Sequence, residues 1–198
     1  HAESRYPPHV LIEAHVLGRP KVGESCSGDA ALVLPLPSLT WVMLVDGLGH
    51  GPKANEAAQL AIDEACKFGE HTEVEQGLQR LHERLRGSRG VAATLGRFDE
   101  RGAILAGVGN VEIRAIGGAS LPFAPSSGVV GGRMTRPRSV RVELPRLARL
   151  LFYTDGIARR APFDALAALD GERLCSTLLT EHSHLHDDAT VVHVTYLG

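Results

Sequence analysis

Four aspartates stand in short contexts marked by glycine or a second aspartate, each where an apolar, strand-like run begins or ends. They are Asp29, Asp46, Asp155 and Asp187. Carboxylates at strand ends can meet at one edge of a sheet, where they repel one another unless a cation lies between them. Hard oxygen ligands favour Mg²⁺ or Mn²⁺ over zinc. The pattern therefore predicts a two-metal hydrolase that acts on phosphate.

Asp46 is the centre of the predicted chemistry. An aspartate that leaves a buried strand can bridge two cations, and the adjacent Gly47 would let a backbone carbonyl approach a metal. Asp155 and Asp187 would complete the ligands of one cation, and Asp29 would bind metal or orient water. Two divalent ions about 3.5–4 Å apart lower the pKa of a bridging water, and the resulting hydroxide would attack phosphorus in line. On this hypothesis Asp29 and Asp46 are the catalytic residues.

Strand pairing alone predicts that two of these carboxylates lie together. Residues 30–36 and 40–45 are typical of strands, and Pro37 and Ser38 between them indicate a turn. If the chain turns there, residues whose numbers sum to 75 face each other, as Asp29 and Asp46 do. The two would then lie side by side at the open end of the hairpin.

The remaining elements predict antiparallel sheets covered by helices. Alanines at helical spacing indicate a helix over 52–67, and Thr72 with Glu75 forms a capping-box pattern for a helix over 72–86. Helical segments are expected at 159–181, and a loop rich in Gly, Pro and Ser at 117–132. Further strands are expected at 10–17, 91–98, 103–108, 111–116, 139–144, 147–154 and 189–196. Hairpin-length connections favour an α+β fold over a parallel, strand-helix alternating one.

Length and composition favour a single domain over residues 1–198, with residues 1–8 expected to be disordered or a tag remnant. The net charge of -2 argues against a nucleic-acid partner. Three cysteines form no disulfide framework or zinc spacing, and no run approaches the ~20 apolar residues of a membrane span. A cytoplasmic monomer is expected. Six arginines and one acid between residues 133 and 149 are either a solvated edge or a surface for an acidic partner.

Two other patterns are weaker. His182, His184 and His186 alternate before Asp187, and this spacing is more typical of an exposed loop than of a zinc or nickel site. The glycines of 128–132 lack the lysine and the strand-to-helix context of a phosphate-binding loop.

Three blocks of the sequence resemble the signature of the PPM family of metal-dependent serine/threonine phosphatases, in its bacterial SpoIIE-type branch. The blocks are residues 46–51, 152–156 and 187–190. Further similarity covers 28–29, 48–56, 89–94, 108–111 and 127–132, so the resemblance extends over nearly the whole chain. The small size without an attached sensor domain is similar to that of phosphatases that reset the stressosome.

The resemblance implies an αββα sandwich with two Mn²⁺ or Mg²⁺ ions at one end. It implies that Asp46 bridges the ions, that the Gly47 carbonyl binds one, that Asp155 and Asp187 bind the other, and that Asp29 lies at the edge of the site. The implied partner is a STAS-domain protein phosphorylated on serine or threonine.

Some positions depart from the family pattern. Leu48 replaces the histidine that eukaryotic members carry after Asp-Gly, and His50 lies two residues further on. In those relatives an arginine holds the phosphate, and by position only Arg19 and Lys21 are candidates for this role. Two alternatives therefore stay open: a phosphoprotein-binding module with weak or no turnover, and a hydrolase of small phosphoesters.

Overall fold

Two antiparallel sheets face each other in the computed structural model, which describes residues 10–118 and 121–198. One sheet has the strand order β1-β9-β8-β6, and the other has the order β2-β3-β4-β5-β7. The strands are β1 (Ile12–Arg19), β2 (Asp29–Pro35), β3 (Thr40–Gly47), β4 (Val91–Asp99), β5 (Gly102–Val108), β6 (Glu112–Ile116), β7 (Ser139–Val142), β8 (Arg149–Tyr153) and β9 (Ala189–Tyr196). The expectation for residues 1–8 lies outside the described residues.

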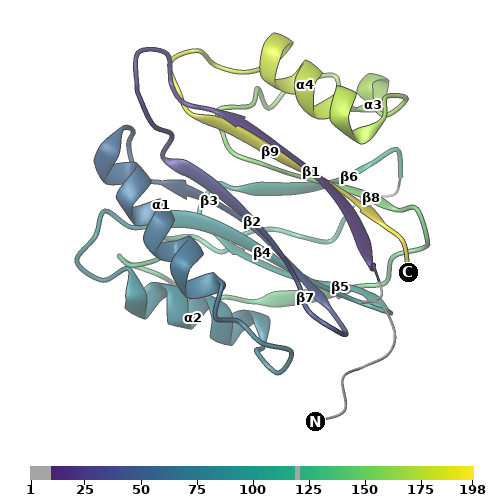
Figure 1. The fold of residues 1–198 in the computed structure, drawn as a ribbon, viewed down its shortest axis with the longest axis horizontal. Coiled ribbons are helices and arrows are strands. Elements are labelled where there is room, and N and C mark those ends of the chain that lie inside the picture. Colours follow the sequence, from purple (N-terminus) through teal and green to yellow (C-terminus); the bar gives the residue numbers. More distant parts are fainter. Residues whose placement is uncertain (1–9, 119–120) are drawn as a thin grey trace.

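Helices cover both outer faces of the sandwich, as Figure 1 shows. They are α1 (Pro52–Ala65), α2 (Val74–Arg84), α3 (Phe163–Leu166) and α4 (Gly171–Glu181). The first two pack on the five-stranded sheet, while α4 packs on β1 and β9 of the other sheet. This arrangement confirms the predicted α+β, αββα sandwich.

The central strand β3 is buried on both faces, which explains its unbroken apolar sequence. Val42 and Leu44 point into the core between the two sheets, whereas Trp41, Met43 and Val45 point into the core under α1 and α2. A strand buried on both sides loses the apolar-polar alternation of a half-exposed strand. The last residue of this strand before Gly47 is Asp46, so the buried run leads directly to a carboxylate.

Small side chains let α1 lie close to the sheet. Its alanines at positions 54, 57, 58, 61 and 65 are all buried, as their helical spacing predicts. The capping box expected at Thr72 and Glu75 is wrong. The helix begins at Val74, the Thr72 hydroxyl instead accepts a hydrogen bond from the Gly69 N–H, and Glu75 accepts one from the hydroxyl of Ser139. The Thr72 contact is local and the Glu75 contact joins α2 to β7, so neither side chain caps the helix.

The helical region expected at 159–181 consists of two helices. Asp170 ends the connection between them and caps α4, since its side chain accepts a hydrogen bond from the Arg173 N–H at 2.9 Å. Within the part of the chain that the structure describes, no helix is both long enough and apolar enough to span a bilayer.

Candidate metal centre

The hairpin of β2 and β3 brings the first two aspartates together. Asp29 is the register partner of Asp46, and Pro35 pairs with Thr40 at the other end of the hairpin. The pairing predicted from the turn position is confirmed. Asp29 is buried and Asp46 is half-buried, so the two carboxyl groups share an environment that is poor in water.

The other two aspartates come from the facing sheet. Asp155 follows β8 and Asp187 precedes β9, and these strands are antiparallel neighbours, so the end of one meets the start of the other. The Thr154 N–H donates to the Thr190 carbonyl at 3.1 Å and ties the two ends together. The Thr154 hydroxyl in turn donates to Asp29 Oδ2 at 2.8 Å, which joins this edge to β2 across the sandwich.

Burial and mutual repulsion raise the pKa values of three of these aspartates, namely Asp29, Asp46 and Asp187. Burial raises the pKa of Asp29 to about 7, although hydrogen bonds from Thr154 and Thr190 act against it. Burial, together with the charges of Asp29, Asp155 and Asp187, raises the pKa of Asp46 to about 9. The pKa of Asp187 is raised in the same direction by burial and by Asp155. All four carboxyl groups are therefore within electrostatic reach of one another.

The donors present fit a hard divalent cation. Asp29 Oδ1 is buried and has no hydrogen-bond partner among the described residues, which is a costly state for a carboxylate oxygen unless a cation satisfies it. Every candidate ligand is an oxygen, and this set suits Mg²⁺ or Mn²⁺. In the described residues no three Asp, Glu, His or Cys side chains close around a common point. The carboxylates are thus gathered at one end of the sandwich without forming a finished coordination shell.

Asn110 is a member of this cluster that the sequence did not single out for a role. It lies between β5 and β6, and its Nδ2 donates to Asp155 Oδ2 at 2.6 Å. One oxygen of Asp155 is held by this bond. The sequence pointed to Asn110 only through the block 108–111, which is one of the segments that resemble the PPM family.

The adjacent aspartates at 187 and 188 have different surroundings. Asp188 is buried, and its two oxygens accept hydrogen bonds from the Lys21 N–H at 2.7 Å and the Gly28 N–H at 2.8 Å. It fixes the connection between β1 and β2, and therefore the position of Asp29. Asp187 is half-buried and closer to the carboxylate cluster.

We expect Asp188→Ala to lower the free energy of unfolding by about 2–4 kcal/mol, because it removes a charged acceptor and leaves the buried Gly28 N–H without a partner. Urea denaturation measures the change. Asp188→Asn is the matched control: it keeps one acceptor oxygen and should lose less. Equal losses in the two variants would show that the two backbone hydrogen bonds do not carry the effect.

Gly47 is required for the approach of α1 to β3. A Cβ atom at this position would lie 2.3 Å from the Ala54 carbonyl oxygen, and the Gly47 N–H donates to the Gly28 carbonyl at 3.0 Å. The backbone of Ala54 and that of Gly28 lie so close to Gly47 that no side chain fits there. The structure thus gives a packing reason for this glycine, while the metal-binding role of its carbonyl stays a prediction.

Gly47→Ala should destabilise the protein by about 1–3 kcal/mol, because α1 or β3 must shift to admit the methyl group. The thermal or urea midpoint measures this loss, and phosphatase assays should show a fall because Asp46 moves with β3. Gly69→Ala is the control, since a Cβ there meets nothing within 4 Å. A neutral effect of Gly47→Ala would contradict the packing argument.

Arg19, Lys21 and His50, the weak substrate-binding candidates of the sequence, differ in their contacts. The guanidinium of Arg19 donates to the carbonyls of Asp187 and His184 and to the Ser183 hydroxyl, at 3.0, 2.8 and 2.7 Å. Its donors hold the 183–187 loop, which makes it a positioning residue for Asp187. His50 Nδ1 lies 2.6 Å from Glu24 Oε1, and Leu48 is exposed. The role of Lys21, like that of His50, stays a prediction.

The alternating histidines fit the exposed-loop interpretation. His184 and His186 are exposed, and their rings lie 5.5 Å apart in a tilted arrangement. Of the six arginines between 133 and 149, Arg141, Arg146 and Arg149 have hydrogen-bond partners, and that of Arg146 is the Leu197 carbonyl. Arg141 pairs with Asp99, and Arg149 donates to His193 and to the carbonyls of Ala167 and Leu169. This segment is therefore not a uniform basic surface.

No protein-family profile matches the chain. Among curated proteins it is similar to "Phosphoserine phosphatase RsbX" of Bacillus subtilis (strain 168), with 26% identity over 141 residues that cover 69% of this chain and 70% of the relative.

Solved structures with the same fold include three informative neighbours. One is described as "The bacterial stressosome: a modular system that has been adapted to control secondary messenger signaling", with a TM-score of 0.85, 27% identity, and coverage of 92% and 98% of the two chains. A crystal structure of RsbX with magnesium has a TM-score of 0.83, 21% identity, and coverage of 98% of each chain. The PPM Ser-Thr phosphatase MsPP of Mycobacterium smegmatis has a TM-score of 0.74, 16% identity, and coverage of 95% and 99%.

The chain thus has the fold of the PPM Ser-Thr phosphatases. In sequence it is similar to the phosphoserine phosphatase RsbX.

Proposed function

We propose that this chain is a Mg²⁺- or Mn²⁺-dependent phosphatase that removes phosphate from phosphoserine or phosphothreonine of a STAS-domain partner in stressosome-type signalling. The observation that carries the proposal is the gathering of Asp29, Asp46, Asp155 and Asp187 at one end of the sandwich, with a buried Asp29 oxygen that lacks a partner. The similarity to RsbX supports the reaction, and the neighbour with magnesium supports the metal.

In this proposal Asp46 would bridge two cations, Asp155 and Asp187 would hold one of them, and Asp29 and the Gly47 carbonyl would complete the site. When bound, the cations would lower the pKa of water and neutralise charge on the phosphoryl oxygens. The chain's own contribution is to hold the ligands in place. Thr154 fixes Asp29, Asn110 fixes Asp155, and Arg19 fixes the backbone at Asp187.

A phosphoprotein-binding module with little turnover is the alternative that one observation favours. Leu48 occupies the position of the family's histidine, and His50 is paired with Glu24 at 2.6 Å. The histidine that the family carries directly after Asp-Gly is thus replaced by a side chain that cannot act as a general acid. The further expectations of a monomer and a cytoplasmic location stay predictions.

The test is phosphate release from a serine-phosphorylated STAS-domain protein, measured with Mg²⁺, with Mn²⁺ and with a chelator. We expect release with either metal, none with chelator, and a higher kcat/KM for the phosphoprotein than for p-nitrophenyl phosphate. If the protein hydrolyses only p-nitrophenyl phosphate, its substrate is a small phosphoester and not a phosphoprotein. Metal binding and phosphoprotein binding without release would establish the binding module.

A further inference from the structure

A basic pocket lies beside the carboxylate cluster, between the first turn of α1 and the loop that follows α2. Its volume is 540 Å³. Lys53 and Glu56 line it from α1, and Arg84, Arg86 and Arg89 line it from the end of α2 and the following loop. All five side chains belong to exposed residues, so the pocket opens to solvent.

The positive charge of the basic pocket is not neutralised internally. The pocket has one carboxylate, Glu56, and four basic side chains, those of Lys53, Arg84, Arg86 and Arg89. None of the four forms an ion pair within the described residues. A concave surface with an excess of one charge focuses the electrostatic field and attracts ligands of the opposite sign. Arginine side chains in particular hold carboxylates and phosphates through paired N–H donors.

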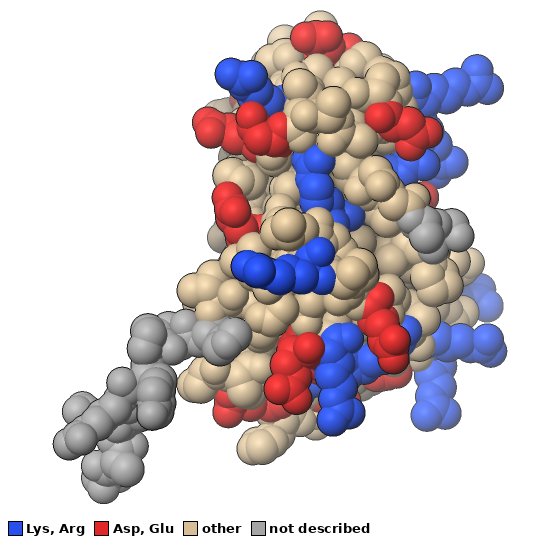
Figure 2. Space-filling model, turned by 90° about the vertical axis from the view of Figure 1, so that its right-hand side faces the viewer, with Lys and Arg blue, Asp and Glu red and all other residues tan. Residues whose placement is uncertain are grey.

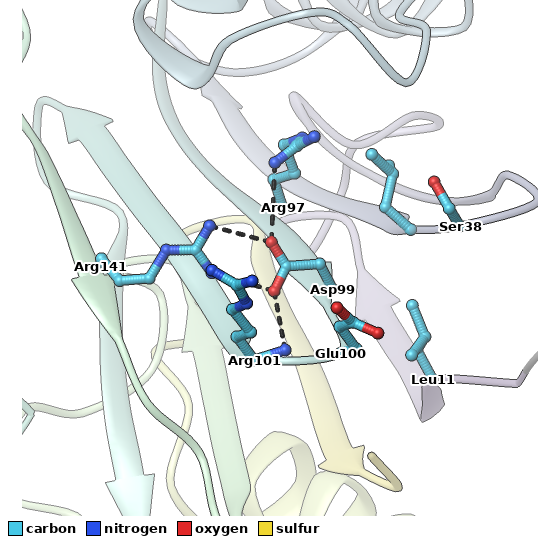
Figure 3. Close-up of a pocket in the computed structure, with 8 residues that line it drawn as sticks. Leu11, Ser38, Arg97, Asp99, Glu100, Arg101 and Arg141 are labelled. Atoms are coloured by element: carbon cyan, nitrogen blue, oxygen red, sulfur yellow. Dashed lines mark hydrogen bonds and ion pairs between the residues drawn. The ribbon is translucent and has the colours of Figure 1, made fainter.

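The arginine pocket at the opposite end of the sandwich differs in this respect. Figure 3 shows Asp99 between Arg97 and Arg141. Both oxygens of Asp99 accept hydrogen bonds from Arg141, at 2.9 Å each, and Arg97 Nη1 lies 3.7 Å from Asp99 Oδ2. On the side of the molecule that Figure 2 shows, basic and acidic side chains are interspersed. The cations of the pocket near the carboxylates have no such carboxylate partner in the described part of the chain.

Backbone contacts tie the basic pocket to the strand end that carries Asp46. Arg89 Nη1 donates to the Leu48 carbonyl at 3.3 Å, and the Leu48 N–H donates to the Gly90 carbonyl at 3.1 Å. Leu48 is two residues after Asp46. A ligand that contacts Arg89 therefore lies next to the predicted metal centre.

The loop that presents Arg86 and Arg89 is held in place. The Ser88 hydroxyl donates to the Leu85 carbonyl at 2.7 Å and accepts from the Gly90 N–H at 3.0 Å. Gly90 has a φ of 79°, and a Cβ atom there would lie 2.8 Å from the Val130 carbonyl oxygen. These contacts hold the backbone from which Arg86 and Arg89 project, so a ligand does not have to order the loop when it binds.

We propose that the basic pocket binds an acidic segment of the phosphoprotein substrate that adjoins the phosphorylated residue. The inference rests on the proposed function and adds a substrate preference to it. Acidic side chains that flank the phosphorylated residue would pair with Arg84, Arg86 and Lys53, while Arg89 lies closest to the metal centre. Such contacts raise the association rate and select among phosphoproteins by the charge of their sequence.

Two phosphoserine peptides test the proposal, one with glutamates and one with glutamines at the flanking positions. The pocket variant is the double charge reversal Arg84→Glu with Arg86→Glu, and the control is Arg101→Glu at the opposite end of the sandwich. For the wild-type protein we expect a higher kcat/KM on the acidic peptide, mainly through KM, with the advantage lost at high salt. The double variant should reduce the acidic-to-neutral ratio of kcat/KM by about tenfold or more. The control should leave the ratio unchanged.

A separate binding measurement distinguishes this proposal from the proposed function. Fluorescence anisotropy with the unphosphorylated acidic peptide needs no turnover, and we expect weaker binding to the double variant than to the wild type or Arg101→Glu. If the wild type hydrolyses neither peptide yet shows this pattern of binding, the proposed phosphatase activity is wrong, while the proposed binding of acidic segments in the pocket is supported. The proposal for the pocket is wrong if the peptide binds equally to all three proteins. It is also wrong if the acidic-to-neutral ratio of kcat/KM is the same in the double variant as in the wild type.

Discussion

Asp46→Asn is expected to remove phosphatase activity while the fold is retained. Asp46 is the carboxylate on which the charges of Asp29, Asp155 and Asp187 act together, so it is the ligand that two cations would share. The loss should exceed the roughly 10–100-fold reduction that follows when a residue that only orients a metal ligand is mutated. Phosphate release from the phosphorylated STAS-domain protein, beside calorimetry of Mg²⁺ and Mn²⁺ binding, measures both consequences.

The same substitution separates a functional role from a structural one. Asparagine has nearly the same volume as aspartate and carries no charge, so metal-free Asp46→Asn should be at least as stable as the metal-free wild type at pH 8. Asp63→Asn, on the exposed side of α1, is the matched control and should keep wild-type activity. Wild-type turnover by Asp46→Asn would remove Asp46 from the site. A loss of both activity and stability would show a structural role instead.

The second large effect is the response of stability to metal and pH. In the unfolded chain both Asp29 and Asp46 titrate near 3.8, whereas in the folded, metal-free protein their pKa values are about 7 and about 9. Between these values the folded state holds protons that the unfolded chain releases. The metal-free protein should therefore lose stability as pH rises from about 4 through 7 to 9.

Divalent metal should reverse this trend, because cations replace the protons and bind more tightly as pH rises. A metal at 100 times its Kd stabilises by about 2.7 kcal/mol, which is about 5–10 °C in Tm for a chain of this length. We expect a Tm increase of this size with Mg²⁺ or Mn²⁺ at pH 8.5 and little increase at pH 5.

Comparison at a fixed pH isolates the metal effect. His193 is buried, and burial together with Arg149 lowers its pKa to about 4, so its contribution to stability is lost as pH falls from 6.5 toward 4. That contribution is the same with and without metal at one pH and cancels in the difference. A metal-induced change in Tm that is equal at pH 5 and 8.5, or that persists in Asp46→Asn, would contradict the carboxylate cluster as the metal site.

The sequence predicted the features that depend on local spacing. The turn at Pro37 and Ser38 sets the register of β2 with β3, so the Asp29–Asp46 pair followed from counting residues. The alanine face of α1 likewise followed from helical periodicity. The mostly antiparallel sheets covered by helices followed from the order of the elements and the short connections between the strands. The hairpin and the helix depend on backbone hydrogen bonding between residues close in sequence, and spacing determines such pairing.

Only the tertiary structure decided which polar groups meet across the sandwich. The Thr154–Asp29 and Asp188–Gly28 hydrogen bonds join segments about 125 and 160 residues apart, and they exist because the apolar faces of two sheets pack together. The same packing gives Asp187 and Asp188 different surroundings and engages Arg19 in holding a loop. It also places the end of α2 beside the start of α1, which creates the basic pocket. Local spacing carries no information about such contacts, because burial of apolar surface is non-directional and the final packing sets them.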